Sequence, residues 1–318
     1  MHLSVVIPLY NESSIINELY ERLTQSLGFL TQDYEILFVD DGSTDNTLSL
    51  LLNLRKTDKK VKIISLSRNF GHQAAYIAGM RNAKGDCIVT MDGDLQDPPE
   101  IILEMYNKLI SEKLDIVQAM KRSRSEGLLK RFLFKTFHKI YTNITGYKDV
   151  ENTGNFAIYN RMSLNALLRI EEKIKYIPGI RQYIGFKQGN ILYDRDKRYN
   201  GKAKMSLAKL FSLAADALFS STKFPIRVCL VLGLIGILVF SGVGIYVLIA
   251  KIAGFAITGW PSTMLSLLFL GFIQLTFLGV IGEYMFRGYK ESQNRPTYFI
   301  QDMYDENNEE NDNIIVNK

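Results

Sequence analysis

Short strand-like apolar runs alternate with stretches of helical length through the first part of the chain. The runs lie at Leu3–Pro8, Tyr34–Val39, Val61–Leu66, Asp86–Met91 and Leu114–Met120. Strands that alternate with helices in this way form a mainly parallel sheet that the helices cover. The pattern therefore predicts an α/β domain at the N-terminal end of the sequence.

Two long stretches without a charged residue follow, Val228–Ala250 and Ile252–Gly282. Each exceeds the roughly 20 apolar residues that a helix needs to cross a bilayer. A buried helical hairpin of a soluble protein is the alternative, but the Gly and Pro inside both stretches are common in membrane spans. Lys and Arg flank the outer ends of the pair, whereas the connection offers only Lys251. The positive-inside rule then predicts that both termini are cytoplasmic.

Two further segments have an amphipathic pattern. Residues 128–141 place apolar side chains on one helical stripe and basic ones on another, which suits a membrane interface. A core-packing helix with a solvated basic face is the open alternative for this segment. Met205–Phe219 has a wide apolar face, leads into the first predicted span, and is expected to lie on the bilayer. The tail after Arg295 is acidic and Asn-rich, which predicts disorder from about residue 301.

Composition narrows the class of protein. The chain has 318 residues, of which 47% are apolar and 22% charged, and this excludes a mostly disordered protein. The N-terminus, "MHLSVVIPLYNES", is not predicted to be a signal peptide, because it lacks a basic leader and a long apolar core. Two cysteines give neither a disulfide scaffold nor a thiolate metal site. The net charge of +5 fits an anionic membrane surface better than nucleic acid, for which no motif is present.

Polar clusters follow three of the predicted strands. They are Tyr10-Asn11-Glu12, Asp40-Asp41-Gly42-Ser43 and Asp92-Gly93-Asp94. Ligands of parallel sheets bind at the carboxyl ends of the strands, so we expect these clusters to line one cleft. Carboxylates this close together either belong to a solvated turn or bind a cation, and in the second case hard oxygen ligands favour Mg²⁺ or Mn²⁺.

Four motifs in this order resemble family 2 glycosyltransferases of the GT-A fold, which is a Rossmann-like fold. They are "VVIPLYNE" at 5–12, "VDDGSTDNT" at 39–47, "SRNFGHQAAYIAGM" at 67–80 and "MDGDLQDPPE" at 91–100. The segment "RYNGKAKMSLAKL" at 198–210 and the two C-terminal spans narrow the resemblance to polyprenyl-phosphate glycosyltransferases. Bactoprenol glucosyltransferases and dolichyl-phosphate mannose synthases are examples of this group.

The resemblance implies roles for individual residues. Asp94 is the expected ligand of a divalent metal, Mg²⁺ or Mn²⁺, and Asp92 is expected at the metal or at the ribose. The residues expected to line the nucleotide pocket are Pro8, Tyr10, Glu12, Asp40, Asp41 and Asp92, although Asp40 could instead cap the next turn. Asp97 is interpreted as a turn residue and Glu100 as a favourable charge in the first turn of a helix.

Two phosphates, one in the donor and one in the lipid acceptor, need cationic contacts. The candidates are Arg68, Arg122, Arg124, Arg131, Arg198 and Lys204, each of which could also be a solvated surface charge. The sequence departs from the resemblance at "GNFAIYNR", where these enzymes usually have Gly-Asp-Phe-Arg-Leu. Asn155 stands at the position of the Asp, which is often assigned as a general base. Asn cannot accept a proton, so that role of Asn155 is open to question.

The hypothesis is an integral membrane enzyme with a GT-A catalytic domain at 1–200, a juxtamembrane helix at 201–225, a transmembrane hairpin at 226–286 and a tail at 287–318. The resemblance implies a multi-pass protein of the bacterial inner membrane with a cytoplasmic catalytic domain, and a homotetramer. It would transfer one sugar from a nucleotide-sugar donor to undecaprenyl phosphate, with inversion at the anomeric carbon, for modification of cell-envelope glycans. UDP-glucose is the favoured donor.

Three alternatives remain at this point. The first is transfer of another sugar, GlcNAc or mannose, to a lipid or hydroxyl acceptor. The second, a processive polysaccharide synthase, would need a Gln-x-x-Arg-Trp motif and more spans, and neither is present in the sequence. The third is a catalytically impaired nucleotide-binding scaffold, which Asn155 favours and the presence of Asp92 and Asp94 opposes.

Overall fold

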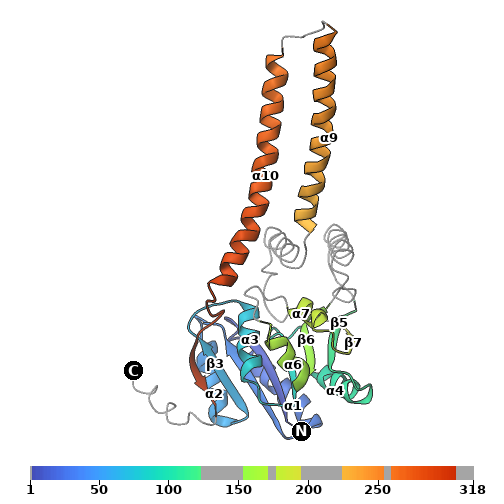
Figure 1. The fold of residues 1–318 in the computed structure, drawn as a ribbon. Coiled ribbons are helices and arrows are strands. Elements are labelled where there is room, and N and C mark those ends of the chain that lie inside the picture. The colour runs from blue at the N-terminus through green and yellow to red at the C-terminus, as the bar shows by residue number, and fades with distance from the viewer. Residues whose placement is uncertain (1, 123–152, 171–176, 195–223, 254–258, 306–318) are drawn as a thin grey trace. The chain divides into compact units, whose positions relative to one another are not determined.

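A computed structural model describes residues 2–122, 153–170, 177–194, 224–253 and 259–305 (Figure 1). The chain divides into two compact units. The first comprises Met1–Thr142, Gly146–Lys204 and Arg295–Lys318, and the second comprises Asn143–Thr145 and Met205–Asn294. The predicted interfacial segment 128–141 and most of the predicted juxtamembrane helix lie outside the described residues.

The first unit is built on an eight-stranded mixed sheet in the order β7-β5-β6-β4-β1-β2-β3-β8. The strands are β1 (Leu3–Leu9), β2 (Tyr34–Asp40), β3 (Val61–Leu66), β4 (Cys87–Thr90), β5 (Ile116–Lys121), β6 (Thr153–Asn160), β7 (Gln188–Tyr193) and β8 (Ile300–Tyr304). β4, β1, β2 and β3 run parallel to one another, and β5 runs parallel to β7. β6 and β8 are antiparallel to their neighbours. The predicted α/β class with a mostly parallel sheet is therefore confirmed.

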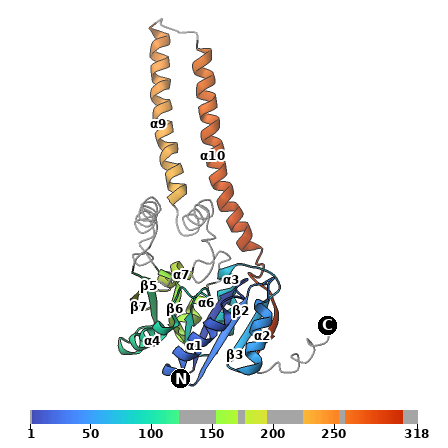
Figure 2. The ribbon, with the colours of Figure 1, turned by 180° about the vertical axis from the view of Figure 1, so that it is seen from behind.

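Helices cover both faces of this sheet, as the views from opposite sides show (Figures 1 and 2). They are α1 (Ile16–Leu30), α2 (Thr47–Thr57), α3 (His72–Asn82), a 3-10 turn η1 (Pro99–Ile101), α4 (Ile102–Ser111), α6 (Arg161–Leu168) and α7 (Ile177–Tyr183). Successive residues of a strand point to opposite faces, so Val5 and Ile7 pack with α1, α2 and α4, and Val6 packs with α3, α6 and α7. Strands buried on both faces are mostly apolar along their length, and for this reason the sequence located them.

The strand β8 corrects one prediction. Disorder was expected from about residue 301, yet Ile300–Tyr304 pairs antiparallel with β3 at the edge of the sheet. The physical reason is that β3 offers an open row of backbone hydrogen-bonding groups, which an otherwise polar segment can satisfy. Tyr304 and Asp305 are buried at the end of this strand. Residues 306–318 lie outside the described part of the chain.

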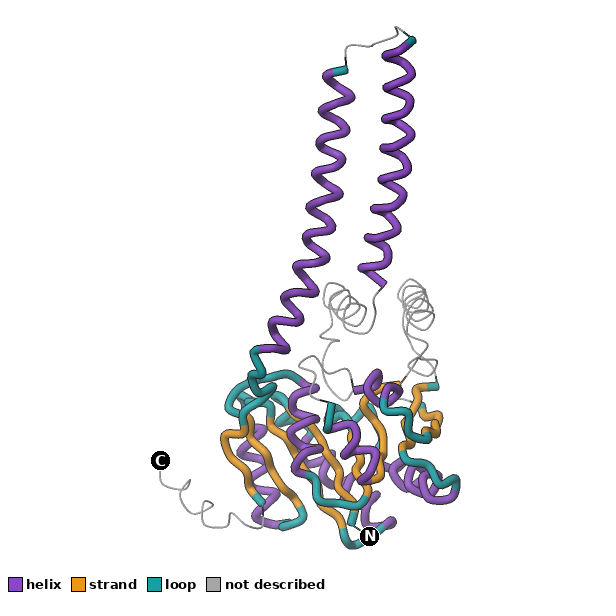
Figure 3. Tube along the Cα trace, in the orientation of Figure 1, coloured by secondary structure: helices purple, strands orange, loops and turns teal. Residues whose placement is uncertain are grey.

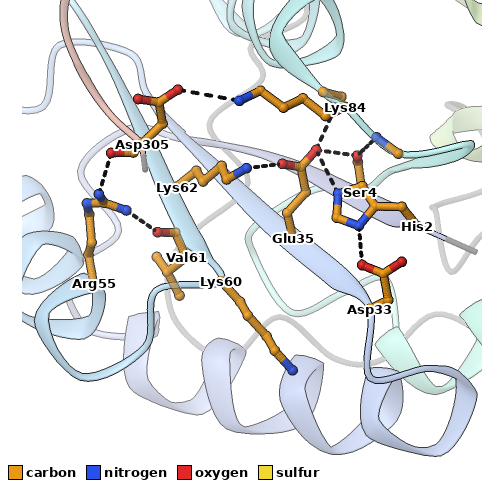
Figure 4. A network of polar contacts seen from close by, with 12 residues as sticks. His2, Ser4, Asp33, Glu35, Arg55, Lys60, Val61, Lys62, Lys84 and Asp305 are labelled. Atoms are coloured by element: carbon orange, nitrogen blue, oxygen red, sulfur yellow. Dashed lines mark hydrogen bonds and ion pairs between the residues drawn. The ribbon is translucent and has the colours of Figure 1, made fainter. Parts of the chain in front are cut away.

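Charged side chains are buried near the amino ends of β1, β2 and β3 (Figure 4). The Glu35 carboxylate accepts from the Lys62 ammonium at 2.6 Å, from the Ser4 hydroxyl at 2.5 Å and from the Lys84 backbone N–H at 2.6 Å. Burial alone would raise the pKa of Glu35, but these donors hold it below its ordinary value. Because the buried Glu35 charge has three donors, it stabilises the join between strands far from the candidate site.

The second unit contains two long helices, α9 (Phe224–Ile252) and α10 (Trp260–Ser292), which appear as the longest purple segments in Figure 3. Both carry exposed large apolar side chains, for example Leu238 on α9 and Phe272 on α10. Within the described residues, one segment, Phe269–Ser292 of α10, is long and apolar enough to cross a membrane by length and composition. The predicted pair of spans falls on α9 and α10, and the first of the two spans stays a prediction.

Candidate active site

Four loops gather at the carboxyl ends of adjacent parallel strands. They follow β4, β1, β2 and β3, which are neighbours in this order in the sheet. In an open parallel sheet this edge is where ligands bind. The predicted nucleotide- and metal-binding residues lie in these loops, except Pro8 and Asp40, which lie at the carboxyl ends of β1 and β2, so the topology brings them all to one edge.

The loops after β1 and β2 are tied together through Asn11. Its backbone N–H donates to the Ser43 hydroxyl at 3.0 Å, and its side-chain oxygen accepts from the Thr44 backbone N–H at 2.8 Å. Asn11 adopts a φ of 54°, a left-handed conformation that Asn tolerates better than most residues. The two predicted pocket residues beside it, Tyr10 and Glu12, are 39% exposed and partly buried, respectively. Pro8 is buried within β1.

Asp40 and Asp41 have different partners, although they are neighbours. The Asp40 carboxylate accepts from the Ser43 backbone N–H at 3.3 Å, which is the capping role considered for it from the sequence. Asp41 accepts from the backbone N–H groups of Phe70 at 2.7 Å and Gly71 at 2.9 Å. Burial raises the pKa of both carboxyl groups above the ordinary value. Asp41 therefore holds the loop after β3 against the loop after β2.

Gly42 is required where these two loops meet. Its φ is +68°, and a Cβ atom there would lie 2.5 Å from the backbone carbonyl carbon of Arg68. Any larger residue would push the two loops apart. The close approach explains why a glycine follows the two aspartates.

Asp92 is held from α3. Its Oδ1 atom accepts from the Tyr76 hydroxyl at 2.7 Å and lies 2.9 Å from Nε2 of His72. Burial would raise the pKa of Asp92, but His72 and Tyr76 hold it well below its usual range. Burial would likewise lower the pKa of His72, and Asp92 instead raises it. Asp92 is therefore a carboxylate at neutral pH, as a metal or ribose ligand requires.

Asp94 lies two residues further along, partly buried, in a turn where Leu95 has a φ of 58°. Its Oδ1 accepts from the backbone N–H of Gln96 at 3.2 Å. Within the described ranges, no group of three or more His, Cys, Asp or Glu side chains is placed to bind a metal. Mg²⁺ commonly takes one or two carboxylates together with substrate phosphates and water, and Asp92 and Asp94 are hard oxygen donors of that number. The two carboxylates thus fit a divalent metal that takes its other ligands from water or from a bound phosphate group.

Asp97 lies in a bend before Pro98, as expected of a turn residue, and its side chain also makes a tertiary contact. Its side chain is 2% exposed, and its Oδ1 accepts from the Tyr193 hydroxyl at 2.5 Å. Tyr193 is the last residue of β7, so this bond joins the loop after β4 to the far edge of the sheet. Glu100 does lie in the first turn after Pro98, and it also forms a bidentate pair with Arg22 at 2.9 Å.

Asn155 lies on β6 beside the end of β4. Its backbone carbonyl accepts from the Thr90 hydroxyl at 2.5 Å, and its side-chain oxygen accepts from Nε2 of Gln73 at 3.4 Å. Gln73 follows His72 on α3, the helix that also holds Asp92. Asn155 and Asp92 therefore contact the same turn of α3, Asn155 through Gln73 and Asp92 through His72 and Tyr76.

The predicted phosphate contacts are only partly described. Arg68 is exposed in the loop after β3, with its guanidinium 4.2 Å from the ring centroid of Phe70. Arg122 follows β5 and pairs with Asp194 at 3.3 Å, both side chains being largely exposed. The remaining candidates lie outside the described residues: Arg124, Arg131, Arg198 and Lys204.

Sequence reasoning missed His72, Tyr76 and Lys121 as members of this region. The Lys121 charge lowers the pKa of Asp92, and a Cβ atom on Gly154 of β6 would lie 3.9 Å from the Lys121 ammonium. The signal for His72 and Tyr76 was their spacing of four in "GHQAAY", which puts both on one face of a helix. No pattern in the sequence pairs that face with Asp92, because the contact forms only in the folded sheet.

The sequence is similar to known glycosyltransferases along nearly its whole length. The family model described as "Glycosyl transferase family 2" matches residues 4–168. An uncharacterised glycosyltransferase of Synechocystis is 39% identical over 306 residues, covering 96% of each chain. A prophage bactoprenol glucosyl transferase homolog of Escherichia coli is 35% identical, over 95% of this chain and 99% of the relative. The bactoprenol glucosyl transferase of Shigella phage SfV is 34% identical, over 95% of this chain and 98% of the relative.

Proposed function

The chain belongs to glycosyltransferase family 2, and from this premise we propose that it transfers one glucosyl residue from UDP-glucose to undecaprenyl phosphate, inverting the anomeric carbon. The similarity to bactoprenol glucosyl transferases of two sources carries the proposal. It spans nearly the whole of each chain, including the region of the two long helices. A lipid acceptor requires membrane attachment, and the apolar segment Phe269–Ser292 supports this part of the proposal.

On the donor side, the carboxylates after β4 would bind a divalent cation together with the diphosphate. Asp94 and Asp92 are the proposed metal ligands, and a bound Mg²⁺ or Mn²⁺ would stabilise the negative charge of the departing nucleoside diphosphate. Asp92 is kept ionised and in one orientation by His72 and Tyr76. The partly exposed Tyr10 and Glu12 are the proposed nucleoside contacts, and Arg68 is the proposed contact to the donor phosphate.

The proposed reaction is a single displacement. An oxygen of the lipid phosphate attacks the anomeric carbon and forms the new C–O bond, and the bond from that carbon to the nucleoside diphosphate breaks. The electron pair of the broken bond leaves on the diphosphate oxygen. The acceptor oxygen is already anionic, so no proton has to move to a protein base, and Asn155 is compatible with this chemistry. Cations such as Lys121 or Arg122 would position the acceptor phosphate.

The proposal is tested with membranes that contain the full chain. They are incubated with undecaprenyl phosphate and, in parallel, with labelled UDP-glucose, UDP-GlcNAc or GDP-mannose, and the label in extracted lipid is counted. We expect label from UDP-glucose in the lipid, with release of UDP. Label from one of the other donors would correct the sugar, and label in water-soluble glycan alone would contradict the lipid acceptor.

Asp94→Asn provides the negative control in this assay. The substitution keeps the size of the side chain and removes its charge, and we expect a loss of at least about a hundredfold, because charge stabilisation by a metal contributes several kcal/mol. Glu104→Gln is the matched control, since Glu104 is an exposed carboxylate in the first turn of α4. Full activity of Asp94→Asn in the presence of EDTA would contradict the assignment of the metal site.

A further inference from the structure

The loop between β3 and α3, residues 67–71, contacts the candidate site and leads directly into α3. The backbone N–H groups of Phe70 and Gly71 donate to Asp41. Arg68 lies over the Phe70 ring, and His72, the first residue of α3, reaches Asp92. A shift of this 67–71 loop would therefore move the Arg68 guanidinium and also His72, the partner of Asp92.

The C-terminal segment contacts this loop directly. The backbone N–H of Ser67 donates to the carbonyl of Phe299 at 3.0 Å. The rings of Phe299 and Phe70 lie with centroids 6.1 Å apart and planes tilted by 52°. This separation is within the range at which aromatic pairs attract each other. The residue just before β8 thus packs on the 67–71 loop by both backbone and side chain.

The far end of β8 is fixed independently. The guanidinium of Arg55, which is 2% exposed, donates to the backbone carbonyl of Asp305 at 2.7 Å and to that of Val61 at 3.0 Å (Figure 4). The Asp305 carboxylate also lies 3.7 Å from the Lys84 ammonium. The contacts of Asp305 therefore fix the position of β8 along β3. The residue before β8, Phe299, is held in place against the 67–71 loop as a result.

From these contacts we propose that Phe299 is a positioning residue for the donor site. Its ring holds Phe70, and through Phe70 it fixes both the backbone N–H groups that bind Asp41 and the guanidinium of Arg68. α10 ends at Ser292 and β8 begins at Ile300, so the segment that supports the donor site is the one that follows the second long helix. This inference rests on the proposed function, because it assigns the 67–71 loop to donor binding.

The exposure of Phe299 separates this role from a contribution to folding. The side chain is 55% exposed, so its removal takes little apolar surface out of a core. The backbone hydrogen bond from Ser67 does not depend on the side chain. A Phe299→Ala variant should consequently fold and insert normally, while losing the ring contact to Phe70.

The test compares Phe299→Ala, Phe299→Tyr and the unchanged full chain in membranes. For Phe299→Ala we expect the KM for UDP-glucose to rise by about three- to tenfold, the range that the loss of one aromatic pair predicts. The KM for undecaprenyl phosphate should stay unchanged, and the melting temperature should fall by at most a few degrees, because one exposed aromatic pair contributes little to the stability of the whole domain. Phe299→Tyr keeps the ring and should restore the KM for the donor. Phe29→Ala is the matched control, because Phe29 is 77% exposed at the end of α1 and has no place in the site.

Hydrogen exchange gives a readout that does not need activity. In the full chain in detergent, the backbone amides of Phe70 and Gly71 should exchange faster in Phe299→Ala than in the unchanged protein, and at the unchanged rate in Phe29→Ala. Equal exchange at these two amides would overturn the proposal, as would equal rises in both KM values. If the unchanged protein transferred no sugar, the proposed function would fail, and the exchange rates would still decide whether Phe299 holds the loop.

Discussion

Asn155 stands where the resemblance to polyprenyl-phosphate glycosyltransferases places an Asp, and an amide at this position is compatible with the proposed lipid-phosphate acceptor. A sugar hydroxyl needs a base as it attacks, whereas a phosphate monoester has a second pKa near about 6 and is largely anionic at neutral pH. We expect Asn155→Ala to lower kcat less than tenfold, because the change removes the contact to Gln73 and no proton acceptor. The pH–rate profile should rise only through about pH 6. A severalfold gain in Asn155→Asp with a second acidic limb would favour a hydroxyl acceptor instead.

Glu35 permits a prediction about stability. Glu35→Gln leaves the buried Lys62 ammonium without its charged partner, and we expect the free energy of unfolding at neutral pH to fall by about 3 kcal/mol. The pKa of Glu35 is lowered in the folded protein, so its contribution is present above its unfolded value of 4.5 and is lost as pH falls through the folded value. The free energies of unfolding of the unchanged protein and of Glu35→Gln, measured by denaturation of the full chain in detergent, should therefore differ less and less as the pH falls below 4.5. A difference independent of pH, or one equal to that of Glu104→Gln, would contradict this account.

At the scale of elements, the sequence located the strands whose signal is local. Val61–Leu66 was predicted with the bounds that β3 has, and Tyr34–Val39 differs from β2 by one residue. Both strands are buried on both faces, and apart from Glu35, Lys62 and Ser65 the two predicted runs are apolar. β8 carries no such run, because it lies at an edge with exposed polar side chains, and its partner β3 is distant in the sequence. Its pairing is set by the free edge of β3, a feature of the assembled sheet.

In the candidate site, too, only the residues with a local signal in the sequence were predicted. The carboxylates were found because they follow predicted strands, and parallel strands end at the same edge. The partners of those carboxylates were not found. Asp97 was interpreted as a turn residue because Pro98 follows it, and its bond to Tyr193 depends on β7 pairing with β5. Local chemistry thus indicated where the site is, and only the tertiary structure showed which side chains orient it.

For the whole molecule, the connection of β8 limits how the chain can cross a membrane. β3 precedes α9 and β8 follows α10, yet the two strands pair in one sheet. Both ends of the helical pair must then lie on the same side of the bilayer, so the number of crossings is even. If Phe269–Ser292 crosses the membrane, the chain between β7 and α10 must cross once more, and we predict that α9, with its 29 residues, makes this second crossing. Basic residues near the outer ends, including Arg227 and Arg287, favour the cytoplasm for that common side.

We predict that reporter fusions at Lys318 signal a cytoplasmic location and that insertions at 254–258 signal the opposite side. A cytoplasmic signal from both positions would mean that neither helix spans the bilayer and that the pair lies on its surface, whereas a non-cytoplasmic signal at Lys318 would contradict the pairing of β8 with β3 in a cytoplasmic domain.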